Sequence, residues 1–235
     1  MTAASPTGAV ALAALLTLAG CASPVIEDDP SGTLIQEPDG AAPAGPQDER
    51  AAARAAEMAR ALEGVRFVDG LVEVEPTGRN DPLLAETLID HGAALLQINR
   101  PVAALAAYAE AARHHPDSAP AFAGVGEALI RKGRIDDASA AFRTALLRDE
   151  SRDDVRYLLA VNETRARRFD VAISTMEDLL ARDPQRGDAH ERLSIWTYYT
   201  GDLAASRAHA TAAAELGHPV PPQFLRRLDS AEAER

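Results

Sequence analysis

Residues 119–152, APAFAGVGEALIRKGRIDDASAAFRTALLRDESR, contain two short amphipathic segments separated by a glycine. In the first segment, Phe122, Val125 and Leu129 recur at three- and four-residue steps and therefore share one helical face. Gly133 ends this predicted helix, and a second apolar stripe with the same period follows it. A helical hairpin of this size leaves one apolar side open, so it needs neighbouring helices.

The same pattern returns when the window is moved by 34 residues in either direction, which divides the chain into repeats 85–118, 119–152, 153–186 and 187–220. Positions 8 and 20 of each repeat hold small residues, where two helices must approach closely, and position 24 mostly holds a larger one. The residues at positions 8, 20 and 24 are Gly92, Gly126, Ala160 and Ser194; Ala104, Ala138, Ala172 and Ser206; and Tyr108, Phe142, Met176 and Ala210.

This period and this pattern of small and large residues resemble the tetratricopeptide repeat (TPR) family. The resemblance implies an all-α, right-handed solenoid of about four helix-turn-helix repeats. Position 4 departs from the family, since only Phe122 keeps the favoured aromatic residue there. Glu163 and Thr197 also depart, because they stand where the first two repeats have Leu95 and Leu129. The third and fourth repeats are therefore the weaker matches to the family.

Segments on both sides of the array are predicted to complete the fold. The array, residues 81–220, begins with Asp81-Pro82, a helix cap followed by proline. Residues 221–235 are expected to form a C-terminal capping helix with a polar outer face. Residues 48–80 contain a run of strong helix formers and then an alternating segment around Asp69-Gly70, which predicts a helix and a hairpin.

Residues 1–21 contain an apolar run that is too short to cross a bilayer and is placed like an export signal, although no Lys or Arg precedes it. The run ends in Leu18-Ala19-Gly20-Cys21, which resembles the lipobox of bacterial lipoproteins, where the cysteine is acylated and becomes the new amino terminus. Cys21 is the only cysteine, so an internal disulfide is excluded and lipidation is the simplest explanation. An ordinary cleaved signal peptide is the alternative.

Residues 22–47 are rich in Pro, Gly, Ala and acidic residues without periodicity, which predicts a disordered tether between the anchor and the folded part. Ala22 follows the cysteine in place of an aspartate. By resemblance to Gram-negative lipoproteins, this favours the outer membrane. The protein is therefore expected in the bacterial cell envelope, lipid-anchored and facing the periplasm.

Charge and motifs exclude several classes of function. The net charge of −12 argues against nucleic acid, because phosphate binding needs a basic stripe. The six histidines show no metal-binding or triad-like spacing, and His190-Glu191 fails the HExxH pattern because the last position is Ser194. No glycine-rich phosphate loop is present. We therefore expect no catalytic residues, no cofactor, no metal site and no small-molecule substrate.

In TPR proteins the first helix of each repeat lines a concave groove, and the resemblance implies which residues face it here. Arg131 and Arg165 occupy the same position of adjacent repeats and are suited to pairing with acidic groups of a ligand. The alternative for Tyr157, Ile195 and Tyr198 is packing between helices. The implied groove residues are Ile89, Ala93, Leu96, Ala123, Glu127, Ile130, Arg131, Tyr157, Val161, Thr164, Arg165, Glu191, Ile195, Tyr198 and Tyr199.

Two functions fit such a protein. A lipid-anchored array of about four TPR units resembles the pilotin-type lipoproteins of tight-adherence (Flp) pili and related secretion systems, which help a secretin assemble in the outer membrane. The resemblance implies an assembly factor with a protein or peptide partner, for which an outer-membrane secretin is the candidate. The alternative is a periplasmic adaptor or scaffold that recruits cell-wall hydrolases or proteases. Both functions would use the same groove.

Overall fold

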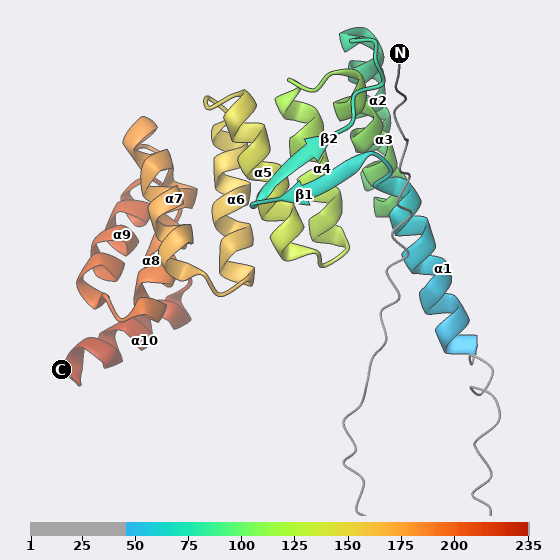
Figure 1. The fold of residues 1–235 in the computed structure, drawn as a ribbon. Helices are drawn as coiled ribbons and strands as arrows, with labels where there is room; N and C mark the ends of the chain where they lie inside the picture. Colours follow the sequence, from blue (N-terminus) through green and yellow to red (C-terminus); the bar gives the residue numbers. More distant parts are fainter. Residues whose placement is uncertain (1–45, 235) are drawn as a thin grey trace, which may run out of the picture. The chain divides into compact units, whose positions relative to one another are not determined.

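The computed structural model describes residues 46–234, which form ten helices and one two-stranded sheet (Figure 1). The predicted signal segment, the lipobox Leu18-Ala19-Gly20-Cys21 and nearly all of the predicted tether lie outside the described residues. Within the described part, no helix combines the length and the apolar character that crossing a membrane requires.

The helices of the array occupy the positions that the 34-residue period assigns to them. The first helices of the pairs are α2 (Pro82–Gln97), α4 (Ala119–Arg131), α6 (Asp153–Arg165) and α8 (Gly187–Thr200). The second helices are α3 (Pro101–His114), α5 (Ile135–Arg148), α7 (Phe169–Arg182) and α9 (Leu203–Glu215). Each first helix packs against its second helix, and successive pairs follow one another along the chain (Figure 1). The predicted TPR-like stack of helix pairs is confirmed.

Local capping explains where several helices begin and end. Asp81 Oδ1 accepts a hydrogen bond from the Leu84 N–H at 3.1 Å, so α2 begins three residues before its repeat. Ser118 Oγ accepts from the Ala121 N–H at 3.3 Å at the start of α4. Gly133 follows α4 with a φ of 72°, a left-handed conformation that glycine adopts without strain.

Small residues determine how closely the helices of a pair approach. A Cβ atom on Gly126 would lie 2.5 Å from the ring of Phe142, and one on Gly92 would lie 2.8 Å from the ring of Tyr108. In both pairs, position 8 of a repeat faces position 24 of the same repeat. Gly124 lies still closer to Tyr108, at 2.2 Å for its hypothetical Cβ. The glycines therefore make room for large aromatic rings at the centre of the helix pairs.

A β-hairpin precedes the array, as the Asp69-Gly70 turn predicts. Strands β1 (Val65–Val68) and β2 (Leu71–Val74) pair antiparallel. Asp69 and Gly70 have φ values of 50° and 75°, as a tight two-residue hairpin turn requires. The Val72 N–H on the outer edge of β2 donates to Thr144 Oγ1 of α5 at 2.8 Å, so the hairpin is attached to the second repeat.

Two further helices flank the array. Helix α1 (Pro46–Ala61) contacts α3 near its C-terminal end, where Ala61 is buried and Met58 packs against the core. Helix α10 (Pro222–Ala233) follows the last repeat and packs on α9 with Leu228 fully buried. A helix is thus present where the sequence predicts a C-terminal cap.

Most of the buried apolar residues fall into two clusters that meet at α6. Val155 and Leu159 of α6 belong to the first cluster, together with the hairpin and the first two repeats. Ala160 belongs to the second cluster, together with α7 and α8. The last turn of α6 carries Asn162 and Glu163, which are both fully buried. The apolar core is therefore interrupted by polar side chains at this point.

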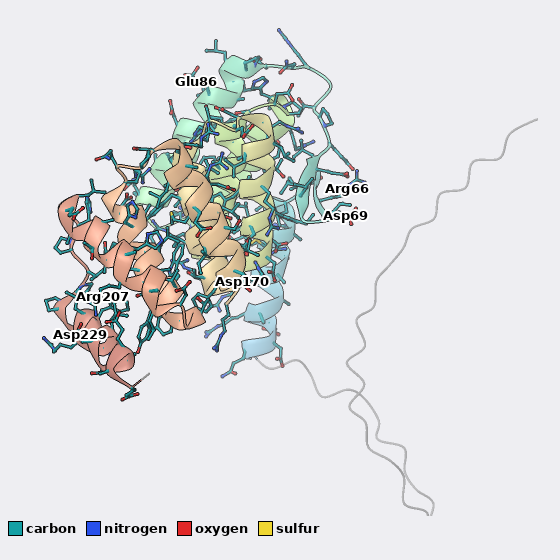
Figure 2. All side chains as sticks on the ribbon, turned by 90° about the vertical axis from the view of Figure 1, so that its left-hand side faces the viewer. Arg66, Asp69, Glu86, Asp170, Arg207 and Asp229 are labelled. Atoms are coloured by element: carbon teal, nitrogen blue, oxygen red, sulfur yellow. The ribbon has the colours of Figure 1, made fainter. Side chains whose placement is uncertain are left out.

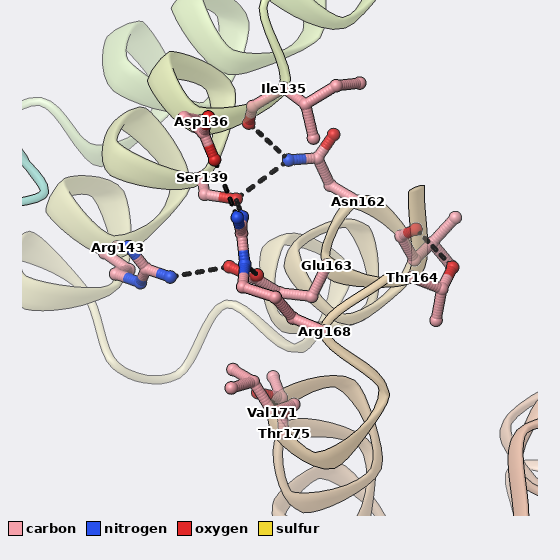
Figure 3. A network of polar contacts seen from close by, with 11 residues as sticks. Ile135, Asp136, Ser139, Arg143, Asn162, Glu163, Thr164, Arg168, Val171 and Thr175 are labelled. Atoms are coloured by element: carbon pink, nitrogen blue, oxygen red, sulfur yellow. Dashed lines mark hydrogen bonds and ion pairs between the residues drawn. The ribbon is translucent and has the colours of Figure 1, made fainter. Parts of the chain in front are cut away.

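Glu163 is the centre of a polar network between the second and third repeats (Figure 3). Arg143 Nη2 donates to Glu163 Oε1 at 2.6 Å, and Arg168 Nε donates to the other carboxylate oxygen. Arg168 Nη1 also pairs with Asp136 at 2.7 Å. Asn162 Nδ2 donates to Ser139 Oγ at 2.9 Å. The departure at Glu163 is thus accommodated by two cations from neighbouring elements, and both helices of the third repeat are present.

Candidate functional site

The predicted groove residues lie on the first helix of each pair but differ widely in exposure. Leu96 and Ala123 are buried in the apolar core, and their contact with a ligand stays a prediction. The remaining residues are exposed or half-buried, and whether they contact a ligand stays a prediction. The exposed ones are Ala93, Glu127, Arg131, Arg165 and Tyr199. The half-buried ones are Ile89, Ile130, Tyr157, Val161, Thr164, Glu191, Ile195 and Tyr198.

Tyr157 is held between the third and fourth repeats by two arginines. The guanidinium carbon of Arg186 lies 5.5 Å from the centroid of its ring, within the range of a cation–π contact. Arg192 Nε donates to the Tyr157 hydroxyl at 3.3 Å. The alternative in which Tyr157 packs between helices therefore describes its contacts, although part of its surface remains accessible.

Tyr198 and Tyr199 have different surroundings at the end of α8. The Tyr198 ring lies edge-on to Phe224 of α10, with centroids 5.4 Å apart, and edge-on to Tyr199 at 5.7 Å. Tyr199 stacks on Phe169 at 6.0 Å yet is 62% exposed. Tyr198 thus helps to attach α10, whereas Tyr199 presents its ring to solvent.

Acid–base pairs recur at equivalent places on successive repeats. Arg152 makes two hydrogen bonds to Asp154 at 2.8 and 2.7 Å, and Arg186 makes the same two to Asp188 at 2.8 and 2.6 Å. These bonds hold the pKa of each aspartate below its usual value. Because these acids already have partners, they are less available to a ligand.

Glu127 and the two predicted arginines have no such fixed partner. Although Glu127 is exposed as a residue, partial desolvation of its carboxyl group is the largest effect that raises its pKa, and the nearby Asp154 adds to it; Arg131 and Arg152 act in the opposite direction. Within residues 46–234, neither Arg131 nor Arg165 makes an ion pair. Their guanidinium groups are exposed and can pair with acidic groups of a partner.

Two clefts of about 490 Å³ lie at the two ends of the array, one acidic and one basic. The acidic cleft, between α2 and α4, contains the predicted groove residue Ile89 together with Glu86, Asp90, Asp117 and Asp149. The basic cleft, between α8 and α10, is lined by Tyr198, Gln223, Arg226, Arg227, Ser230, Ala231 and Glu234. The α10 residues of this cleft were not among the predicted groove residues, because α10 lies outside the repeats.

The fourth repeat contains a pair of histidines in contact, which their spacing in the sequence does not predict. His190 of α8 and His209 of α9 place their Nδ1 atoms 3.0 Å apart. His190 Nε2 lies 3.3 Å from the Pro184 carbonyl, which only accepts, so Nε2 carries the proton and His190 Nδ1 accepts from His209. Burial and His190 lower the pKa of His209. No group of three or more potential metal ligands occurs in the described part of the chain.

Lowering the pH from 7.5 to 5.5 is expected to destabilise the fourth repeat through His209. Since its pKa is lower in the folded state, the unfolded chain binds more protons in this range. The stabilising contribution is present above the unfolded value of about 6.5 and is lost as the pH falls through the lowered pKa. Urea unfolding at both pH values measures this, and His209→Asn should reduce the loss. An equal loss in His209→Asn would contradict the prediction, and the exposed His91→Asn serves as control.

Comparison with known proteins agrees with this architecture. Residues 95–161 match the model of the tetratricopeptide repeat family. A stretch of 78 residues is 35% identical to Superkiller protein 3 of Schizosaccharomyces pombe, covering 33% of this chain and 6% of that protein. The chain thus spans only a small part of this curated relative.

Solved structures with the same fold include three proteins of low sequence identity. MamA from Desulfovibrio magneticus is 18% identical with a TM-score of 0.58, over 65% of this chain and 85% of MamA. YrrB, described as a TPR protein with an unusual peptide-binding site, is 20% identical with a TM-score of 0.52, over 58% and 69%. PilF of Pseudomonas aeruginosa is 17% identical with a TM-score of 0.55, over 64% and 68%. At these identities the likeness shows the fold alone.

Proposed function

We propose that this chain is a lipid-anchored protein-binding module that acts as a pilotin-like assembly factor for a pilus or secretion apparatus of the bacterial envelope. The observation that carries the binding role is the alignment of partly exposed side chains on successive first helices. Arg131, Arg165 and Tyr199 belong to this row and extend from the second to the fourth repeat. We use "groove" below for this row and the half-buried residues beside it.

The side chains of the groove fit a segment of a partner protein with some acidic character. Exposed aromatic and arginine side chains are the types in which binding energy concentrates at protein interfaces. Arg131 and Arg165 repeat at the period of the helix pairs, as expected for contacts with an extended or helical segment. YrrB, which shares the fold, is described as having a peptide-binding site, and this supports the same use of the array here.

The anchoring part of the proposal rests on Cys21 and the lipobox residues before it. Acylation at Cys21 with more than one chain would hold the protein durably at a membrane, whereas a single chain binds marginally. This lipid anchor and the presence of Ala22 after the cysteine lead us to propose a location at the outer membrane, with the array in the periplasm. An outer-membrane secretin is the proposed partner.

Capture from membranes of the native organism tests this proposal. The anchored protein and a Cys21→Ser variant are compared for fractionation, for acylation by mass spectrometry and for co-purifying proteins. We expect acylation and membrane association for the native protein only, with a secretin as its partner. Co-purification of cell-wall hydrolases or proteases in place of a secretin would favour the adaptor function. An unmodified Cys21 would exclude the lipid anchor.

The triple variant Arg131→Gln/Arg165→Gln/Tyr199→Ala is expected to capture the partner about 30-fold or more weakly than the natural chain, as for residues that dominate an interface. The exposure of all three side chains predicts little change in thermal stability. Tyr157 and Tyr198 are less suitable, because they are half-buried between helices, whereas Tyr199 stacks on Phe169 but is 62% exposed. Val171→Ala on α7 removes an exposed apolar side chain outside the groove and is the control. Unchanged capture would refute the groove assignment.

A further inference from the structure

The capping helix α10 carries two neighbouring arginines, which solvation of the last repeat does not require. We infer that Arg226 and Arg227 of α10, together with Tyr198 of α8, form a binding site for carboxylate groups of an acidic protein segment. This inference rests on the proposed function, because the segment is the one held by the groove. It adds α10 to the binding surface and gives the partner a chemical requirement at one end of the array.

The first argument is the lining of the basic cleft. This cleft of about 490 Å³ lies between Tyr198 and one side of α10. Its α10 wall carries two guanidinium groups, each with several N–H donors in a fixed planar fork that matches a carboxylate. The amide of Gln223 adds further donors at the same wall. Glu234 is the one acidic residue of the lining and stands after the last residue of the helix.

The second argument is the charge balance of α10. Its two carboxylates, Asp229 and Glu232, are both bound by Arg207 of α9, at 2.5 Å and 2.6 Å. Figure 2 labels Arg207 and Asp229 of this group. Both acids therefore have a cationic partner on α9, although the single charge of Arg207 balances only one of them. In the described part of the chain, Arg226 and Arg227 make no ion pair of their own. Counted together, Arg207, Arg226 and Arg227 exceed Asp229 and Glu232 by one positive charge, and the two arginines without an ion pair lie on α10, in a chain whose net charge is −12.

The third argument is that the site is rigid and continuous with the groove. Leu228 is fully buried and the Arg207 contacts hold α10 on α9, so the two guanidinium groups project from a fixed helix. The ring of Tyr198 is held edge-on between Phe224 and Tyr199. Since Tyr199 is exposed beside it, a segment lying in the groove would reach the basic cleft directly.

The charge of the site favours an acidic protein segment over nucleic acid. Two neighbouring arginines offer a short cationic site, whereas a phosphate backbone is bound by an extended basic stripe. In the described part of this acidic chain, most arginines of the array already pair with carboxylates and so do not form such a stripe. Carboxylates spaced along a peptide are therefore the matching ligand.

The test uses the full chain carrying Cys21→Ser and a fluorescein-labelled hexaglutamate peptide as the probe, followed by fluorescence anisotropy. Arg226→Gln/Arg227→Gln is expected to weaken binding about 5- to 30-fold, as two partly exposed charge pairs would. Binding to the unsubstituted chain should also weaken as salt is raised. Arg50→Gln/Arg54→Gln removes the same charge from exposed positions of α1 and should leave the affinity nearly unchanged.

Several results would overturn the inference. Equal affinity of the Arg226→Gln/Arg227→Gln variant would do so, as would an equal loss in the α1 control, which would indicate a general charge effect. Stronger competition by inorganic phosphate or a single-stranded oligonucleotide than by unlabelled hexaglutamate would reassign the site to phosphate. Circular dichroism shows whether α10 remains folded, and Arg226→Lys/Arg227→Lys should retain part of the binding. If Arg131 and Arg165 variants lose the natural partner while α10 variants keep it, the proposed function stands and this inference falls.

Discussion

Replacing Arg143 and Arg168 together by methionine is expected to lower the free energy of unfolding by about 3–5 kcal/mol, the usual effect of leaving a buried charge without its partner. Glu163 is fully buried, and its carboxylate is bound by these two guanidinium groups (Figure 3). The arginines themselves are 39% and 36% exposed, so the unfavourable term lies with the carboxylate. Urea unfolding followed by circular dichroism measures the change.

The repeats themselves supply the matched control for this prediction. The positions of Ser139, Arg143, Asn162 and Glu163 are occupied one repeat earlier by the apolar residues Leu105, Ala109, Ala128 and Leu129. A variant carrying Ser139→Leu, Arg143→Ala, Asn162→Ala and Glu163→Leu is expected to be at least as stable as the natural chain, because an apolar core often replaces a buried ion pair without loss. Unchanged stability of the methionine variant would show that Glu163 does not depend on its cations.

The spacing of small and large residues was sufficient to predict the helix pairs, because these residues recur at the positions where the helix faces pack against each other. The Asp69-Gly70 hairpin was also predictable, since its turn chemistry is contained in two adjacent residues. The network around Glu163 was not. Its cations lie 20 and 5 residues away on other elements, and a position-by-position comparison of repeats shows only that a leucine is missing.

The candidate site was predictable in part for the same reason. Helical periodicity places the groove residues on one face, but it does not show how far the neighbouring helix covers that face. For example, Ala123 is buried, although the repeat assigns it to the groove. The basic cleft could not be predicted, because α10 has no counterpart in the repeat. The residue spacing also does not show that Arg207 binds both acids of that helix.

Gly126→Leu is expected to destabilise the second repeat by about 3 kcal/mol or more, at the upper end of the effects of overpacking. A Cβ at this position would already lie 2.5 Å from the ring of Phe142, which is fully buried. Helix propensity acts in the opposite direction, since replacing a helical glycine by a better helix former stabilises by up to about 1 kcal/mol. A net loss of stability therefore identifies the contact with Phe142 as the dominant effect.

The third repeat provides the compensating change, because it has Ala160 and Met176 where the second has Gly126 and Phe142. Gly126→Ala and Phe142→Met are each expected to destabilise, the first by overpacking and the second by leaving a cavity beside a glycine. The double variant should recover most of the loss, because a flexible methionine side chain makes room for the added methyl group. A double-mutant cycle from urea unfolding measures the coupling energy between the two positions. Additive losses would mean that the residues at positions 8 and 24 are not energetically coupled, so the size of one does not restrict the size of the other.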